Sequence, residues 1–187
     1  MRIIAGSARG RTLQSPKTRE IRPTRDRVRE SIFSILGPVD EMVVLDGFAG
    51  SGALGLEALS RGARKAYFFD PSREAIETIR ENIERVRVPD RALVKRCRFH
   101  QGIESSIDEP CDLVFLDPPY GKELGQAALE ALLRAPETLS QHALIVWEMG
   151  SDEEAQPPRG FQCVDERIYG SSRILFLRPV AAEEEIS

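Results

Sequence analysis

The chain has 187 residues, of which 41% are hydrophobic, so it can bury one well-packed core with a small extension but leaves little room for two full domains. No apolar stretch approaches the length of a membrane span, about 18 residues, and the apolar segment at the N-terminus is too short for a signal peptide. We therefore expect a cytoplasmic protein with no membrane partner. Cys97, Cys111 and Cys163 lack metal-site spacing and predict buried thiols with no bound metal.

The net charge of −4 conceals a basic N-terminal region. Residues 1–38 carry nine Arg or Lys side chains against three Asp or Glu, whereas the rest of the chain is acidic. Eight of the nine cations are arginine, which contacts phosphate in bidentate fashion. The composition therefore favours a nucleic-acid-binding extension over an ordinary solvated surface.

The extension is expected to contain a hairpin and a helix. Residues 3–5 and 11–13 flank a turn-like segment and predict a short β-hairpin, which a basic stretch through Pro23 follows. Thr24 is the expected N-cap of a helix that ends before Gly37-Pro38. Arginines would lie on one face of this helix, and the packed face would carry Val28, Ile32, Phe33, Ile35 and Leu36.

From residue 42 onward, apolar runs alternate with amphipathic stretches, which predicts a mostly parallel, doubly wound sheet. Strands are expected at Met42–Asp46, Lys65–Asp70, Leu93–Phe99, Asp112–Asp117 and Ala143–Glu148, and helices near residues 53–60, 73–87 and 124–134. Only three residues join the strands expected at Phe161–Tyr169 and Arg173–Leu177, so these two must be antiparallel.

Seven strands in this order are typical of a class I S-adenosylmethionine-dependent methyltransferase, an α/β, Rossmann-like fold. We expect residues 1–38 to form the basic extension and residues 39–180 to form the methyltransferase domain. Residues 181–187, with three consecutive glutamates, are expected to be a frayed acidic tail.

The glycine-rich segment after the first strand suggests a cofactor loop. Residues 50–55 match the dinucleotide fingerprint G-x-G-x-x-G, and Asp70 follows at the expected distance, so this segment alone does not exclude an NAD enzyme. Asp46 would repel a pyrophosphate but suits a sulfonium cofactor, S-adenosylmethionine. Gly47, Gly50 and Gly52 would allow close approach of the backbone, with Phe48 beside them.

The carboxylate of Asp70 is placed to accept both ribose hydroxyls of such a cofactor. The alternative is that Asp70 caps the helix after Pro71. Ser72 can take this capping role instead, which leaves Asp70 for the ligand.

Asp117-Pro118-Pro119-Tyr120, directly after a buried-type strand, is the expected catalytic segment. The prolines stiffen the backbone and donate no N–H, so the segment offers acceptors. The Asp117 carboxylate and the Pro118 carbonyl can hold both protons of an exocyclic amino group, while Tyr120 stacks on the base. A proline turn with a capping Asp is the structural alternative.

Four segments together resemble the RsmD family of 16S ribosomal RNA guanine-N2 methyltransferases over residues 1–178. They are Met1–Gly6 with Gly10-Arg11, Arg22–Phe33, Leu45–Gly55 and Asp117–Tyr120. The resemblance implies N2 methylation of one small-subunit guanine, S-adenosylmethionine as donor and a basic extension that contacts RNA. By position it implies cofactor binding by Asp46, Gly47, Gly50 and Asp70, and base binding by Asp117, Pro118 and Tyr120.

RNA contacts are expected from the extension through Arg11, Arg22, Thr24, Arg25 and Arg29. The chain departs from the family at His100-Gln101-Gly102-Ile103, where an Asp or Asn usually meets the adenine of the cofactor. Gln101 is the candidate substitute, and His100 is expected at the end of a strand. We expect a monomer that acts on 16S ribosomal RNA or on a small-subunit assembly intermediate, and not on DNA.

Three other functions are compatible with parts of this pattern. An adenine-N6 methyltransferase uses a similar acceptor segment but normally carries a further target-recognition domain. A protein-glutamine methyltransferase resembles Asn-Pro-Pro-Tyr rather than Asp-Pro-Pro-Tyr. A non-catalytic RNA-binding assembly factor would have no need to keep Asp46, Asp70 and Asp117 together.

Overall fold

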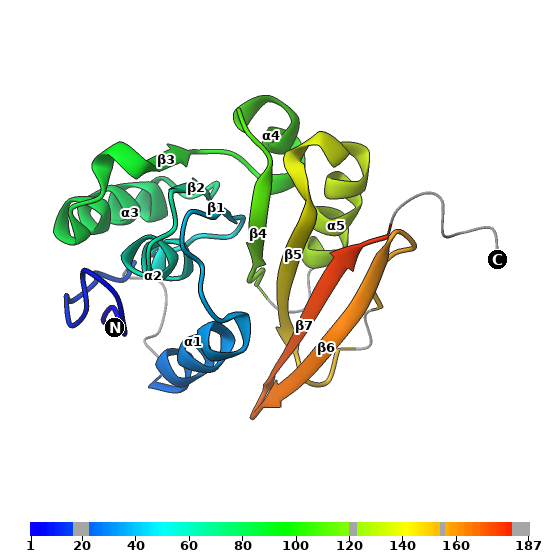
Figure 1. The fold of residues 1–187 in the computed structure, drawn as a ribbon, viewed down its shortest axis with the longest axis horizontal. Coiled ribbons are helices and arrows are strands. Elements are labelled where there is room, and N and C mark those ends of the chain that lie inside the picture. The colour runs from blue at the N-terminus through cyan, green and yellow to red at the C-terminus, as the bar shows by residue number, and fades with distance from the viewer. Residues whose placement is uncertain (17–22, 120–122, 154–155, 181–187) are drawn as a thin grey trace. The chain divides into compact units, whose positions relative to one another are not determined.

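Strands and helices alternate along most of the chain in the computed structural model (Figure 1). The structure describes residues 1–16, 23–119, 123–153 and 156–180. The chain consists of two compact units, Met1–Arg98 and Phe99–Ser187. The expected tail at residues 181–187 lies outside the described residues.

The first unit holds three parallel strands in the order β3-β2-β1. Its elements are α1 (Pro23–Leu36), β1 (Val43–Asp46), α2 (Ala53–Ser60), β2 (Lys65–Phe69), α3 (Arg73–Val86), the 3-10 turn η1 (Pro89–Arg91) and β3 (Ala92–Lys95). Every residue of β1 is buried, and apolar residues at helical spacing bury one face of α3. Burial of both strand faces explains the continuous apolar runs in the sequence.

The second unit holds four strands in the order β4-β5-β7-β6. Its elements are α4 (Phe99–Ser106), β4 (Cys111–Leu116), α5 (Leu124–Arg134), η2 (Pro136–Thr138), β5 (Leu139–Gly150), β6 (Phe161–Tyr169) and β7 (Ser172–Pro179). β4 pairs with β5 in parallel, whereas β7 pairs antiparallel with both β5 and β6. The predicted α/β class is confirmed: the seven strands form a mostly parallel sheet that ends in an antiparallel hairpin.

Local expectations for the first unit differ from the structure at three places. The N-terminal hairpin is reduced to one bridge between Arg2 and Thr12. Helix α1 begins at Pro23, so Thr24 lies within the helix and is not its N-cap. The third strand is shorter than predicted and ends at Lys95.

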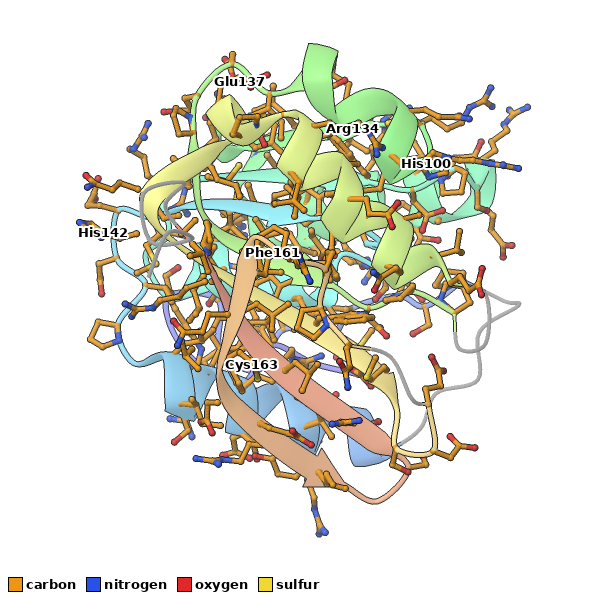
Figure 2. The ribbon with its side chains drawn as sticks, turned by 90° about the vertical axis from the view of Figure 1, so that its right-hand side faces the viewer. His100, Arg134, Glu137, His142, Phe161 and Cys163 are labelled. Atoms are coloured by element: carbon orange, nitrogen blue, oxygen red, sulfur yellow. The ribbon has the colours of Figure 1, made fainter. Side chains whose placement is uncertain are left out.

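Two further differences concern the second unit. Phe99, expected at the end of a strand, begins the unpredicted helix α4. Cys163, which was expected to be buried, is exposed. It lies on β6, and Figure 2 labels it together with Phe161, the first residue of that strand. In the described part of the chain, no helix has the length and apolar character needed to cross a membrane.

Candidate active site

The loop between β1 and α2 begins at a buried carboxylate. Asp46, the last residue of β1, is 2% exposed. Its Oδ2 accepts a hydrogen bond of 3.1 Å from the backbone N–H of Gly55 in α2. A buried carboxylate needs such donors, so this contact orients Asp46 at the start of the loop. Gly47, which is buried, and Phe48, which is half-buried, follow it.

The backbone of this loop adopts conformations that favour glycine. Gly50 and Gly52 have φ angles of 57° and 77°, which a side chain would strain. Gly52 is the N-cap of α2, and a Cβ atom there would lie 3.3 Å from the ring of Phe68 in β2. Glycine at this position therefore lets the loop pack directly against the neighbouring strand.

Asp70 connects the end of β2 to the glycine loop. Its Oδ2 accepts a hydrogen bond of 3.0 Å from the backbone N–H of Gly50, and its Oδ1 accepts one of 2.8 Å from Ser72. The side chain of Ser72 caps α3 by accepting from the backbone N–H of Ala75. The expectation that Ser72 takes the capping role is thus confirmed.

The chemistry of these groups fits an adenosyl cofactor with an amino-acid tail. A carboxylate offers about four lone-pair sites, and the two backbone contacts of Asp70 leave capacity for ribose hydroxyls. Asp70 is half-buried, so part of the residue is exposed. The first unit therefore brings together Asp46, Gly50, Gly52 and Asp70.

The second unit supplies the acceptor segment. Asp117 and Pro118 follow directly after β4, whose apolar residues are buried. Asp117 is half-buried, Pro118 is buried and Pro119 is exposed. Tyr120, the predicted stacking residue, lies outside the described residues.

The predicted adenine contact, Gln101, follows β3 in the chain but lies in α4, and His100 is therefore not at the end of a strand. His100 and Gln101 belong to the first turn of this helix. The side chain of Gln101 is exposed, and that of His100 is half-buried. No hydrogen bond of the described residues assigns a partner to Gln101, so its role stays a prediction.

Arg29 is not part of an exposed basic face, contrary to the expectation from sequence. It is 3% exposed, and its Nη2 donates to the backbone oxygen of Arg2 at 2.6 Å and to Asp26 Oδ1 at 3.1 Å. Its Nε lies 3.8 Å from Glu57 Oε2. Burial lowers the pKa of Arg29, while the carboxylates of Asp26 and Glu57 act in the opposite direction. Arg29 therefore has a structural role.

The other predicted RNA contacts have different outcomes. Arg11 is half-buried, and its Nη1 donates to the backbone oxygen of Arg85. Arg22 lies outside the described residues, and the side chains of Thr24 and Arg25 are likewise not described.

Glu57, which the sequence analysis missed, organises the N-terminal arm, defined here as residues 1–13. It is fully buried in α2, and its carboxylate accepts the backbone N–H groups of Ile4 at 2.8 Å and Ala5 at 3.0 Å. Arg61 Nε donates to Glu57 Oε1 at 2.7 Å. The signal in the sequence was a lone acid within the apolar segment Ala53–Leu59.

Comparisons with known proteins agree with these elements. The family model described as "Conserved hypothetical protein 95" matches residues 1–178. The chain is 35% identical over 173 residues to "Ribosomal RNA small subunit methyltransferase D" of Haemophilus influenzae, which covers 91% of this chain and 89% of that protein. A protein of the same name from Escherichia coli K12 is 38% identical over 149 residues, covering 79% and 74% of the two chains.

A solved structure supports the same assignment. The chain matches "Putative methyltransferase yhhF from Escherichia coli" with a TM-score of 0.84 and 33% identity, over 97% of this chain and 98% of that one. The fold is that of the class I S-adenosylmethionine-dependent methyltransferases. The chain therefore belongs to the RsmD family, whose sequence model is described as conserved hypothetical protein 95.

Proposed function

We propose that this protein is an S-adenosylmethionine-dependent methyltransferase that acts on ribosomal RNA, at the exocyclic N2 amino group of one guanine in the small-subunit 16S RNA. The observation that carries the proposal is the 35% identity over 173 residues to a relative named ribosomal RNA small subunit methyltransferase D. That match includes nearly the whole chain, 91%, and 89% of the relative.

The first unit would hold the cofactor. When bound, S-adenosylmethionine supplies an electrophilic methyl group on a positively charged sulfur. Asp70 would accept hydrogen bonds from the ribose hydroxyls, and the Asp46 carboxylate would favour the positive charge. Gly47, Gly50 and Gly52 would let the backbone approach the methionine portion, beside Phe48. Gln101, which belongs to α4 of the second unit, remains the candidate for the adenine contact.

The acceptor segment would hold the target amino group. Its nitrogen lone pair is delocalised into the base, so two acceptors that hold both N–H protons can make that lone pair available. The Asp117 carboxylate and the Pro118 carbonyl are suited to this role, and Tyr120 would stack on the base. Asp117 would also stabilise the positive charge that develops on the nitrogen.

Residues 1–38 would serve as the RNA-binding extension of the methyltransferase domain at residues 39–180. Because Arg29 is buried, the contacts to RNA would come from Arg11, Arg22, Thr24 and Arg25. We further propose that the protein acts as a monomer, on 16S RNA or on a partly assembled small subunit.

Transfer of tritium from labelled S-adenosylmethionine to 16S ribosomal RNA tests the proposal, followed by mass spectrometry of the digested nucleosides. The native protein should yield N2-methylguanosine. The Asp117→Ala variant should lose transfer by at least about a hundredfold, since one preorganised hydrogen-bond partner contributes on that scale. Its affinity for the cofactor, measured by calorimetry, should stay within about twofold, because the residue contacts the base.

The modified nucleoside distinguishes the competing functions. N6-methyladenosine in place of N2-methylguanosine would contradict the choice of guanine. RNA binding without any transfer by the native protein would instead favour a non-catalytic assembly factor.

A further inference from the structure

An open cleft of about 320 Å³ lies within the first unit, between the N-terminal arm and α1. Its volume is at the small end of the range of about 300–1,000 Å³ typical of ligand pockets, so it has room for one nucleotide. The lining residues come from two segments of the chain: Arg2, Ile3, Ile4, Arg9 and Gly10 from the arm, and Asp26, Arg27 and Glu30 from α1.

The walls of this cleft are fixed by hydrogen bonds. The backbone N–H of Ile3 donates to Arg11 at 3.0 Å, and that of Gly10 donates to Ile3 at 2.9 Å. Arg29, in α1, donates to the backbone oxygen of Arg2 at 2.6 Å and so joins the two walls. These contacts order both walls of the cleft, so binding would require little further ordering of the protein.

The charged groups of the cleft are of two kinds. The side chains of Arg2, Arg9 and Arg27 are exposed, and none of them forms an ion pair or hydrogen bond with another described residue. Asp26 and Glu30 lie one helical turn apart on α1. Asp26 is half-buried and already pairs with a buried arginine, whereas Glu30 is exposed.

This combination matches a nucleotide better than a simple anion. Guanidinium groups suit the phosphates on either side of a nucleotide. A carboxylate suits a base edge that carries N–H donors, and guanine presents two adjacent donors at N1 and N2. An acidic protein segment is a poorer match, because Asp26 and Glu30 would repel it.

We propose that this cleft binds one guanosine of the RNA strand other than the methylated base. Arg2, Arg9 and Arg27 would contact its flanking phosphates, and Glu30 would accept hydrogen bonds from its base edge. The inference rests on the proposed function only for the identity of the polymer. The residues concerned are not those assigned to the cofactor or to the acceptor segment.

Binding of labelled hexaribonucleotides to the full chain tests the cleft. One strand carries a single guanosine among uridines, and the other carries inosine, which lacks the N2 amino group. Arg9→Glu and Arg27→Glu should each weaken binding of both strands about tenfold or more and flatten its salt dependence. Arg80→Glu, the same charge change at an exposed position of α3, serves as the matched control and should alter affinity less than about threefold.

Discrimination between the bases isolates the role of Glu30. The native protein should prefer the guanosine strand about fivefold or more, and Glu30→Gln should remove most of that preference. The proposal is overturned if Arg9→Glu and Arg27→Glu bind like Arg80→Glu, or if Glu30→Gln keeps the native preference. Free guanosine monophosphate should compete far more weakly than the strand, and stronger competition would identify a mononucleotide site instead. Better competition by oligoglutamate would identify an acidic protein partner.

The methyl-transfer assay separates this inference from the proposed function. The native protein could transfer methyl groups to 16S RNA while both charge-reversal variants bind RNA like the native protein. This result would refute RNA binding by the cleft and leave the enzyme assignment intact. A native protein that transfers no methyl group, but whose RNA binding depends on Arg9 and Arg27, would support the cleft and contradict the enzyme assignment.

Discussion

The substitution Glu57→Gln should destabilise the protein strongly although it changes the size of the side chain little. Glu57 is fully buried and accepts hydrogen bonds from three donors: the backbone N–H groups of Ile4 and Ala5 at 2.8 and 3.0 Å, and Arg61 at 2.7 Å. The Nε of Arg29 lies 3.8 Å from its carboxylate and forms an ion pair with it. A glutamine has one acceptor oxygen, and its NH₂ group would face donors. The substitution therefore removes the charge and leaves buried donors without partners.

The magnitude follows from the burial of the arginine partner. Removing one member of a buried ion pair costs about 3–5 kcal/mol, because the other charge stays buried without compensation. Arg29 keeps its contact with Asp26 at 3.1 Å, so the lower end, about 3 kcal/mol, is expected. For a chain of this length, that loss corresponds to a fall in melting temperature of about 6–12 °C.

Thermal unfolding followed by circular dichroism measures this loss. The matched control is Glu77→Gln in α3, which removes the exposed ion pair between Arg73 and Glu77 at 2.8 Å. Exposed pairs contribute little, so the control should melt within experimental error of the native protein. A melting temperature of Glu57→Gln within about 2 °C of the native value would refute the assigned role of the buried network.

The remaining predictions concern the cofactor, the backbone and the thiols. Asp70→Ala should weaken S-adenosylmethionine binding about ten- to a hundredfold in calorimetry, because a charged acceptor is worth about 1.5–3 kcal/mol, and unchanged affinity would exclude the ribose contact. Gly6→Ala should cost about 2–4 kcal/mol in urea unfolding, since φ is +83° and a Cβ atom would lie 1.8 Å from backbone of α2. Gly10→Ala, at φ +84° with open space around it, should cost only about 1 kcal/mol, and equal losses would contradict this reasoning. Iodoacetamide should modify the exposed Cys163 before the buried Cys111. Because desolvation raises the pKa of the Cys163 thiol, the rate of its alkylation should still increase with pH where that of a free thiol has become constant.

The strands and four of the five α-helices of the described residues could be predicted because their sequence patterns are local. The helix predicted to end before Gly37 corresponds to α1. The helices predicted near residues 53–60, 73–87 and 124–134 correspond to α2, α3 and α5. Each has apolar residues at helical spacing, and α3 also has its Ser72 cap. Helix α4 was missed because it is short and begins at Phe99, the end of the mixed apolar and basic segment Leu93–Phe99 that was predicted as one strand.

The roles of charged residues were harder to predict because they depend on contacts between distant parts of the chain. For Asp46 and Asp70 the positions at the ends of parallel strands could be predicted, and such ends lie along one edge of a sheet. Arg29 resembles its neighbours in the sequence, and only its contacts with Arg2 and Glu57 show that it is buried. A charge count from the sequence therefore treats the buried Arg29 in the same way as an exposed arginine.

Arg27 and Arg29 show how one helix can serve two purposes. Two residues along an α-helix correspond to about 200° of rotation, so the side chains of Arg27 and Arg29 point to nearly opposite sides of α1. Arg29 points inward and ties the N-terminal arm to Glu57 in α2, whereas Arg27 is exposed and lines the cleft. Helix α2 also begins at the glycine loop, where the backbone of Gly55 holds Asp46. The proposed nucleotide cleft and the glycine loop are therefore anchored to the same helix, since Glu57 holds the backbone of the N-terminal arm and Gly55 holds Asp46.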